Sequence, residues 1–359
     1  MHYGFGVENS KIQNDAEIET HAYSILSEQE LDALANSDLS KAPDWVKGDY
    51  PQWLDDSLKY IFNDNRAEEM AQMAKPAPLD LRVNVAISSV EDVIEELSTS
   101  PKLAQKPDKT KLSPWGIRIP WNNGKNFPFA IEPSFLLGKF EVQDEASQLC
   151  AYLTGANEGQ IIADVCAGGG GKTLALAAMT NNKARIIAYD TDPNRIAPIH
   201  DRLRRVGIAE IDVRTQRRGQ DTFSDILDKC DIVLIDAPCT GSGTWRRAPD
   251  TKWRLTPQNI EKRQNDQQSA LKLGAPLVKK NGILVYVTCS ILPDENDDSV
   301  EKFLNQNPQF KPKPIDEHLK QHGLEHILNH VHKTKFGIQF SPLKSDTDGF
   351  YFAVIERNI

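Results

Sequence analysis

Residues 161–179 read IIADVCAGGGGKTLALAAM, and this stretch decides the fold. Its first five residues, IIADV, are mostly apolar, which predicts a short buried β-strand. The last eight, KTLALAAM, are largely good helix formers, and a run of four glycines separates them from the strand. A strand, a glycine turn and a helix form one βα unit of a parallel sheet, so the following sequence is expected to repeat the alternation.

The alternation continues to the end of the chain. Strands are predicted at residues 184–190 (ARIIAYD), 210–215 (EIDVRT), 231–235 (DIVLI) and 282–289 (GILVYVTC), with helices between them, one of them from about Thr256 to Lys280. Residues 348–357 (DGFYFAVIER) add a closing strand. Five βα repeats with right-handed crossovers predict an α/β fold with a doubly wound sheet.

Two smaller units are expected before this sheet. Residues 1–75 are acidic and largely helical in pattern, and residues 76–135 combine strand-like PLDLRVNVAI and WGIRIP with a capped helix, SSVEDVIEELS. We therefore predict an N-terminal helical segment (1–75), a small α+β unit (76–135) and the main α/β domain (136–359).

Charge is divided unevenly among these units. The net charge of the 359 residues is −9. Residues 1–75 hold 15 acidic and 6 basic side chains, which accounts for all of it, and the rest is neutral with 36 of each. Arginines cluster within sixty residues of this neutral part, either as solvated surface charge or as a phosphate-contacting face: Arg195, Arg202, Arg204, Arg205, Arg214, Arg217, Arg218, Arg246, Arg247 and Arg254.

The cysteines and the hydropathy limit the class of protein. Five widely spaced cysteines without a Cys-x-x-Cys pair predict reduced thiols and no metal site. No apolar run approaches the roughly 20 residues of a membrane span, and the N-terminus lacks a signal pattern. We expect a cytoplasmic, monomeric protein without membrane contact.

The glycine loop is expected to bind a ligand. A Walker A loop requires glycine where Cys166 stands, and the glycines lack the G-x-G-x-x-G spacing of a dinucleotide fingerprint. Asp190 ends the second strand, where a carboxylate can accept hydrogen bonds from ribose hydroxyls. Because no phosphate-binding motif is complete, S-adenosylmethionine fits best, held by Asp190, Asp236 and the loop residues Cys166, Ala167, Gly168, Gly169, Gly170, Gly171 and Lys172.

Two cysteines follow neighbouring strands. Asp236 ends the strand at 231–235 and Cys239 lies on the loop after it, while Cys289 ends the strand at 282–289. The carboxyl ends of parallel strands meet at one edge of the sheet, where ligands bind. Either cysteine alone is as consistent with core packing as with catalysis, but two at one edge beside a cofactor loop favour catalysis.

The motifs CAGGGGKT (166–173), DAPCTGSGTWRRAPDTKW (236–253), TCSILPDEN (288–296) and GKFEVQDEASQL (138–149) resemble the Nop/Sun/RsmB family of S-adenosylmethionine-dependent RNA cytosine-5 methyltransferases. The resemblance covers Pro78 to the C-terminus. It implies a Rossmann-like class I methyltransferase domain preceded by a small RNA-binding subdomain. In bacterial members of this type the usual substrate is ribosomal RNA.

The resemblance also implies roles for the residues at the sheet edge. Cys289 would add to carbon 6 of cytosine, and Cys239 would act in releasing the product. Asp236 would hydrogen-bond the ring edge as the adduct forms. Lys252 and Arg247 would contact substrate phosphate or lower the thiolate pKa, with a structural salt bridge to Asp250 as the alternative. The target base must be unstacked for carbon 6 to be reached.

The chain departs from the family pattern at two places. Gly168 and Gly169 stand where the family usually has Ala-Pro, so we expect a more flexible loop with weaker cofactor affinity unless neighbouring residues hold it. Many relatives carry an aspartate after the third strand that meets the adenine. Here Thr215, Gln216 and Arg217 occupy that region, and Gln216 or Asp221 would have to accept the hydrogen bond.

Two rival functions remain open from the sequence. A DNA cytosine-5 methyltransferase would use Cys239 as its nucleophile, but its usual Glu-Asn-Val motif is absent and Cys289 would be unexplained. A non-catalytic RNA-binding assembly factor would have no reason to retain both cysteines, Asp236 and Lys172.

Overall fold

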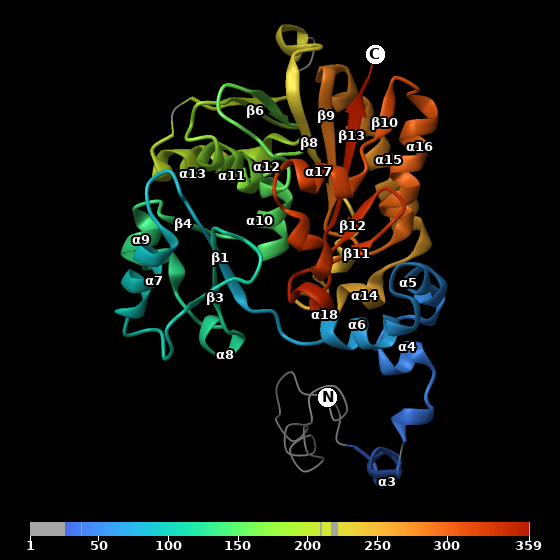
Figure 1. The fold of residues 1–359 in the computed structure, drawn as a ribbon. Helices are drawn as coiled ribbons and strands as arrows, with labels where there is room; N and C mark the ends of the chain where they lie inside the picture. Colours follow the sequence, from blue (N-terminus) through green and yellow to red (C-terminus); the bar gives the residue numbers. More distant parts are fainter. Residues whose placement is uncertain (1–25, 37, 209, 217–221, 359) are drawn as a thin grey trace.

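The computed structural model describes residues 26–36, 38–208, 210–216 and 222–358, and two sheets lie side by side in it (Figure 1). The larger sheet has the order β11-β12-β13-β9-β8-β5-β6-β7, with β10 paired to β13. Strands β7, β6, β5, β8 and β9 are parallel, and β13 runs antiparallel to β9. The strands are β5 (Ile161–Asp164), β6 (Arg185–Asp190), β7 (Asp212–Thr215), β8 (Cys230–Asp236), β9 (Val278–Thr288), β10 (Phe310–Pro312), β11 (His332–Lys333), β12 (Gly337–Gln339) and β13 (Tyr351–Arg357).

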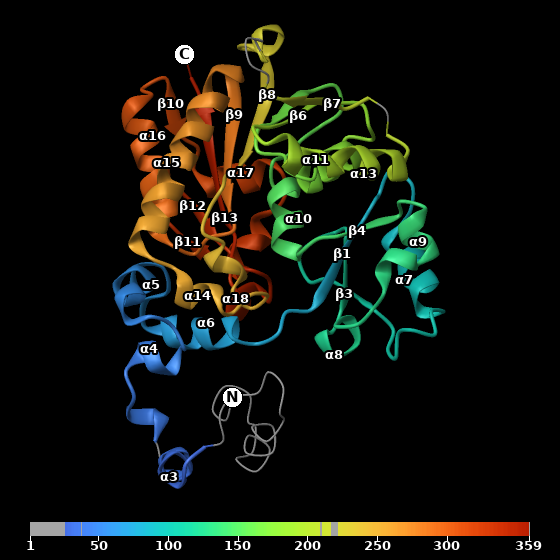
Figure 2. The same ribbon diagram turned by 180° about the vertical axis from the view of Figure 1, so that it is seen from behind.

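Helices cover both faces of this sheet, which gives three layers (Figure 2). One core lies under α10 (Glu145–Tyr152), α11 (Gly171–Met179) and α17 (Ile315–Gln321), and the other under α15 (Pro257–Gly274) and α16 (Asp297–Gln306). This part also contains the helices α12 (Pro193–Ile196), α13 (Pro198–Val206), α14 (Thr251–Arg254) and α18 (Pro342–Ser345). The predicted α/β doubly wound fold is confirmed.

The long helix is shorter than predicted. The sequence predicts a helix to about Lys280, but α15 ends at Gly274 and β9 begins at Val278. Pro276 lies in the turn between them, and proline has no N–H with which to continue a helix.

The smaller sheet is antiparallel, with the order β2-β3-β1-β4. Its strands are β1 (Leu79–Val83), β2 (Asp108–Lys109), β3 (Gly116–Ile119) and β4 (Phe140–Val142). The accompanying helices are α7 (Val90–Ser98), α8 (Trp121–Gly124) and α9 (Pro133–Leu136). Ser89 caps α7 through a capping box with Asp92, as the sequence indicates. Because β4 lies at 140–142, the sheet continues past residue 135, and the division into domains stays a prediction.

Within the described residues, the small sheet is preceded by α3 (Glu28–Asn36), α4 (Asp44–Lys47), α5 (Asp55–Phe62) and α6 (Arg66–Met73). The helical character predicted for residues 1–75 can be compared only from Leu26 onward, since residues 1–25 lie outside the described part. Helices α5 and α6 lie beside α14 and α18 in both views (Figures 1 and 2). Their segment contributes the buried Leu58 and Phe62 to a core that also contains Trp245 and Leu292 of the large domain.

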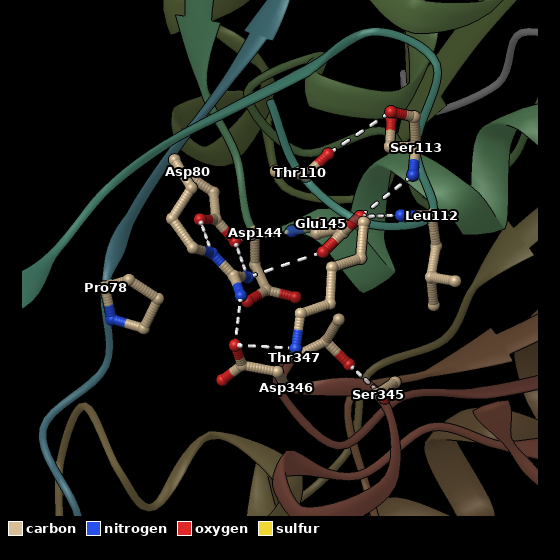
Figure 3. Close-up of polar contacts among 12 residues, drawn as sticks. Pro78, Asp80, Thr110, Leu112, Ser113, Asp144, Glu145, Ser345, Asp346 and Thr347 are labelled. Atoms are coloured by element: carbon tan, nitrogen blue, oxygen red, sulfur yellow. Dashed lines mark hydrogen bonds and ion pairs between the residues drawn. The ribbon is translucent and has the colours of Figure 1, made fainter. Parts of the chain in front are cut away.

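Ion pairs of Arg118 with Glu145 and Asp346 join the small sheet to the large domain (Figure 3). Arg118 of β3 donates to both carboxylate oxygens of Asp80, each at 2.7 Å, and to Asp346 beyond α18, also at 2.7 Å. Glu145, at the start of α10, accepts the backbone N–H groups of Leu112 and Ser113. These contacts tie the two sheets together.

Candidate active site

The two predicted cysteines meet. Their Sγ atoms are 3.2 Å apart, and both thiols are free. Cys239 follows β8 and Cys289 follows β9, and these neighbouring parallel strands bring both loops to the same carboxyl edge. The hydrogen bond to Cys289 and burial together raise the pKa of the Cys239 thiol well above its ordinary value. Cys239 is therefore held as a protonated thiol beside Cys289.

A buried carboxylate holds the two cysteine loops in place. Glu295 is fully buried and accepts the backbone N–H and the hydroxyl of Thr240, at 2.8 and 2.5 Å, next to Cys239. It also accepts the hydroxyl of Ser290, at 2.6 Å, next to Cys289. Burial raises the pKa of Glu295. No pattern in the sequence singles out this residue, although the motif TCSILPDEN contains it.

Direct contacts between the loops complete this arrangement. The hydroxyls of Ser242 and Ser290 are 2.9 Å apart, and the Gly243 N–H donates to the Cys289 carbonyl oxygen at 2.9 Å. Both serines are fully buried. The separation of the two thiols is thus fixed by a network of buried hydrogen bonds.

Asp236 and Lys172 form an ion pair at the same edge of the sheet. Lys172 Nζ donates to Asp236 Oδ2 at 2.7 Å, and the lysine side chain is 6% exposed. Burial by itself lowers the pKa of Lys172, but the charge of Asp236 and the hydrogen bond to it outweigh burial and raise that pKa. Asp236 is about one third exposed, so its carboxylate meets both the ammonium and the solvent.

Cys166, at the start of the predicted loop, lines a cavity of about 490 Å³, whereas Ala167, the four glycines and Lys172 are not among its lining residues. Cys166 and Asp190 line it with Arg195 and Gln216. Asp190 Oδ2 accepts the Gly168 N–H at 3.0 Å, which fixes the loop against the end of β6. The other predicted loop residues, Ala167, Gly169, Gly170, Gly171 and Lys172, follow Cys166 and lead into the first turn of α11.

Glycine is required at position 170. Its φ is +82°, and a Cβ there would lie 2.4 Å from Ile199 Cγ1. Both facts exclude a side chain, because L-residues avoid this backbone region and the neighbouring isoleucine fills the space.

Two arginines hold the loop that the extra glycines are expected to loosen. Arg202 of α13 donates to the Gly169 carbonyl oxygen at 2.7 Å, and Arg82 of β1 donates to the Gly171 carbonyl oxygen at 2.5 Å. Glu141 of β4 accepts from Arg202 at 2.8 Å. The small sheet therefore supplies part of the support of the glycine loop.

The region after β7, where an adenine contact is predicted, is partly described. Gln216 lines the cavity, and Thr215 donates from its hydroxyl to the Asp190 carbonyl oxygen at 3.0 Å. Arg217 and Asp221 lie outside the described residues. Which residue accepts from the adenine stays a prediction.

Lys252 and Arg247 are held in ion pairs. Lys252 is 3% exposed and donates to Asp49 of the N-terminal helical segment. Arg247 donates to Asp144 at 3.0 Å and to Asp348 at 2.5 Å. Asp250, the alternative partner in the sequence analysis, pairs with Arg254 instead. Neither residue is among those lining the cavities at Cys166 and Cys239, and their contact with RNA stays a prediction.

Comparison with known proteins decides the family. The model of the 16S rRNA methyltransferase RsmB/F family matches residues 151–356, more than half of the chain. The chain belongs to this family. The resemblance to the Nop/Sun/RsmB methyltransferases is thereby confirmed, and with it S-adenosylmethionine as the cofactor, which agrees with the cavity at the glycine loop.

Individual relatives agree with this assignment. The chain is 31% identical over 314 residues to the ribosomal RNA small subunit methyltransferase B of Pasteurella multocida, covering 86% of this chain and 65% of the relative. It is 29% identical over 313 residues to a probable methyltransferase B of Synechocystis, covering 86% and 67%. The crystal structure of PH0851 superposes with a TM-score of 0.76 at 28% identity, covering 92% of this chain and 72% of that one. The chain thus spans about two thirds of the length of these curated relatives.

Two further observations concern membranes and metals. No helix in the described part of the chain is both long and apolar enough to cross a membrane. Among the described residues, no group of three or more His, Cys, Asp or Glu side chains is arranged to hold a metal ion.

Proposed function

We propose that this protein methylates carbon 5 of a cytosine in ribosomal RNA through a covalent cysteine adduct. The observation that carries the proposal is the pair of thiols 3.2 Å apart at the sheet edge that also holds the Asp236 and Lys172 ion pair. Carbon 5 of cytosine is a weak nucleophile, and addition of a thiolate to carbon 6 converts the ring into an enamine that can accept a methyl group. Family membership supports RNA as the substrate class.

Cys289 is proposed as the nucleophile. Its Sγ forms a bond to carbon 6 at the start of the reaction, and the same bond breaks at the end, after a proton has left carbon 5. Glu295 and Ser290 hold the loop that carries this thiol, so it meets the ring in a fixed position.

Cys239 is proposed to assist release. It lies within hydrogen-bonding distance of Cys289, and its raised pKa keeps it protonated while Cys289 acts. A protonated thiol at this position can pass its proton to the departing Cys289 sulfur, directly or through water, while a water molecule takes the proton from carbon 5.

Asp236 and Lys172 are proposed to bind the polar edge of the ring. A carboxylate oxygen of Asp236 can accept from the exocyclic amino group and from ring nitrogen 3 when that nitrogen is protonated in the adduct. Lys172 fixes the carboxylate in this orientation through its hydrogen bond.

The residues around the glycine loop fit S-adenosylmethionine. Asp190 would accept from the ribose hydroxyls, and the Cys166 side of the loop would face the methionine part. When bound, the cofactor supplies an electrophilic methyl group on a sulfonium sulfur. The cavity that they line also reaches Pro238, next to Cys239, so the cofactor and the target base would be neighbours.

The first test is transfer of a tritiated methyl group from S-adenosylmethionine to total RNA from cells that lack this protein, followed by nucleoside analysis. Label in 5-methylcytidine is expected. Label confined to another nucleoside would refute the proposed reaction. If isolated RNA takes up no label, assembling ribosomal particles are tested in the same way, and absence of label there would favour a non-catalytic binding role.

Two variants then separate the roles of the cysteines. Cys289→Ala is expected to abolish methyl transfer and any covalent protein–RNA adduct. Cys239→Ala is expected to accumulate such an adduct, because addition proceeds while release fails. Full activity of Cys289→Ala would refute the nucleophile assignment, and an active Cys239→Ala without adduct would remove Cys239 from the mechanism. Cys230→Ala, buried at the start of β8 and so at the opposite end of that strand from Asp236, is the matched control thiol.

A further inference from the structure

Eight of the ten clustered arginines lie in the described part of the chain, and they differ in their contacts. Six of them pair with carboxylates of the protein: Arg202 and Arg205 with Glu141, Arg204 with Asp201, Arg214 with Asp212 and Asp225, and Arg246 and Arg247 with Asp144 and Asp348. Arg195 lines the cofactor cavity. Arg254 is different, because it lies at the wall of a second cavity that contains Cys239.

This second cavity has a volume of about 350 Å³. Cys239 and Thr240 line one part of it, and the rest is formed by α14 and the first turns of α15. Its basic residues are Arg254, Lys262 and Arg263, and none of the described residues that line it is acidic. This combination suits a nucleotide. Its base would reach the thiol, and its phosphate would stay at the surface beside the cations.

The second cavity adjoins the cofactor cavity. Arg263 lines both, and the Cys239 loop contributes Pro238 to one and Cys239 to the other. A base that enters past Arg254 and Lys262 would therefore approach the cofactor from the side of the thiols.

We propose that Arg254 and Lys262 bind the phosphates that flank the target nucleotide of a single-stranded RNA segment. This proposal rests on the proposed function, since it names the substrate contacts of the same site. It differs from the expectation for Lys252 and Arg247, whose charges are already engaged by Asp49, Asp144 and Asp348.

The two proposed residues are available to phosphate. Lys262 is exposed. Arg254 pairs with Asp250 four residues before it, and both side chains are about two thirds exposed or more. Exposed pairs of this kind are weak because water and salt screen them. Arg263 pairs with Asp266 at 3.0 Å and is less exposed, so it is better placed to shape the wall than to bind a phosphate.

The test measures the salt dependence of RNA binding. A single-stranded oligocytidine is titrated with the full-length protein and S-adenosylhomocysteine, which prevents turnover, over a range of salt concentrations. The slope of log K against log salt is negative, and its magnitude falls by about 0.7 for each phosphate of a single strand that the protein no longer neutralises. Lys262→Ala and Arg254→Ala are each expected to lower the magnitude of the slope by about 0.7, which corresponds to about fivefold weaker binding at roughly 0.1 M salt.

Lys272→Ala is the matched control. Lys272 is exposed on the same helix, ten residues after Lys262, which is about 15 Å along the axis. Its removal changes the total charge equally but is expected to leave the slope unchanged. Cofactor affinity is measured in parallel and is expected to be unchanged in Lys262→Ala and Arg254→Ala.

The outcomes separate this proposal from the proposed function. Unchanged slopes in both variants, with methylation of cytidine intact in the wild type, would overturn the phosphate contacts and leave the reaction standing. Slopes of lower magnitude in a protein that forms no 5-methylcytidine would support the contacts and reject the reaction. Equal effects of all three substitutions would mean that total charge alone matters, which also overturns the proposal.

Discussion

Replacing Arg82 with methionine is expected to weaken S-adenosylmethionine binding without unfolding the protein. Arg82 is 2% exposed, and its guanidinium donates to the Gly171 carbonyl oxygen at 2.5 Å and to Gln143. Methionine retains an apolar stem of similar length but cannot donate a hydrogen bond. The glycine loop then loses the support that it receives from β1.

The magnitude follows from the kind of hydrogen bond that is removed. A hydrogen bond from a charged donor contributes roughly 1.5–3 kcal/mol. Arg202 still holds Gly169, so we expect the free energy of cofactor binding to weaken by the lower end of this range. That loss corresponds to an about tenfold higher Kd. The free energy of unfolding should change less. Arg82 Nε is buried without a partner among the described residues, so removing the guanidinium also removes a desolvation cost.

Isothermal titration with S-adenosylmethionine measures the Kd, and thermal unfolding of the same samples measures stability. Arg202→Met is expected to change the Kd in the same direction. Arg204→Met is the control, because Arg204 is exposed on the same helix as Arg202 and pairs locally with Asp201. A Kd for Arg82→Met within about twofold of the wild type would refute the reasoning. A higher Kd matched by an equal loss of stability would show general destabilisation instead.

Two further predictions concern titratable groups. Peroxide is expected to oxidise Cys239 and Cys289 to a disulfide with release of two waters, since their sulfurs are 3.2 Å apart. Methyl transfer should be lost and restored by dithiothreitol; retained activity and free thiols after peroxide would contradict this. Burial lowers the pKa of His318 to about 4, so the unfolded chain takes up a proton first as pH falls below 6.5. Unfolding free energy should drop by about 3 kcal/mol between about pH 6.5 and 4, and His318→Gln should flatten this dependence in denaturant titrations; an unchanged curve would exclude His318 as the cause.

The parallel strands and the thiols at their ends can be predicted because the signals are local. A run such as DIVLI predicts a buried strand by itself, and the residue after the strand must lie at the sheet edge. The sequence places Asp236, Cys239 and Cys289 at one edge for this reason, and the structure brings the two thiols together.

The supports of the site cannot be predicted in the same way. Glu295 meets Thr240 from 55 residues away, and Arg82 meets Gly171 from 89 residues away. Lys252 meets Asp49 across 203 residues. Such pairs depend on how separate units of the fold pack, and no periodicity in the sequence encodes them. The predicted end of α15 is wrong for a local reason, because the helical pattern continues past Pro276 while the backbone cannot.

The arginine cluster shows why charge in a sequence is a weak guide to an RNA-binding face. Ten arginines within sixty residues suggest a basic stripe, yet Arg202, Arg214 and Arg246 pair with buried or half-buried carboxylates. The carboxylates neutralise these arginines, so the pairs leave little positive potential at the surface. Electrostatic attraction for RNA then depends on the few cations whose carboxylate partners are exposed, because such exposed ion pairs are weak. The salt slopes of Lys262→Ala and Arg254→Ala measure this difference directly, since a stripe would lose the same increment at any arginine or lysine.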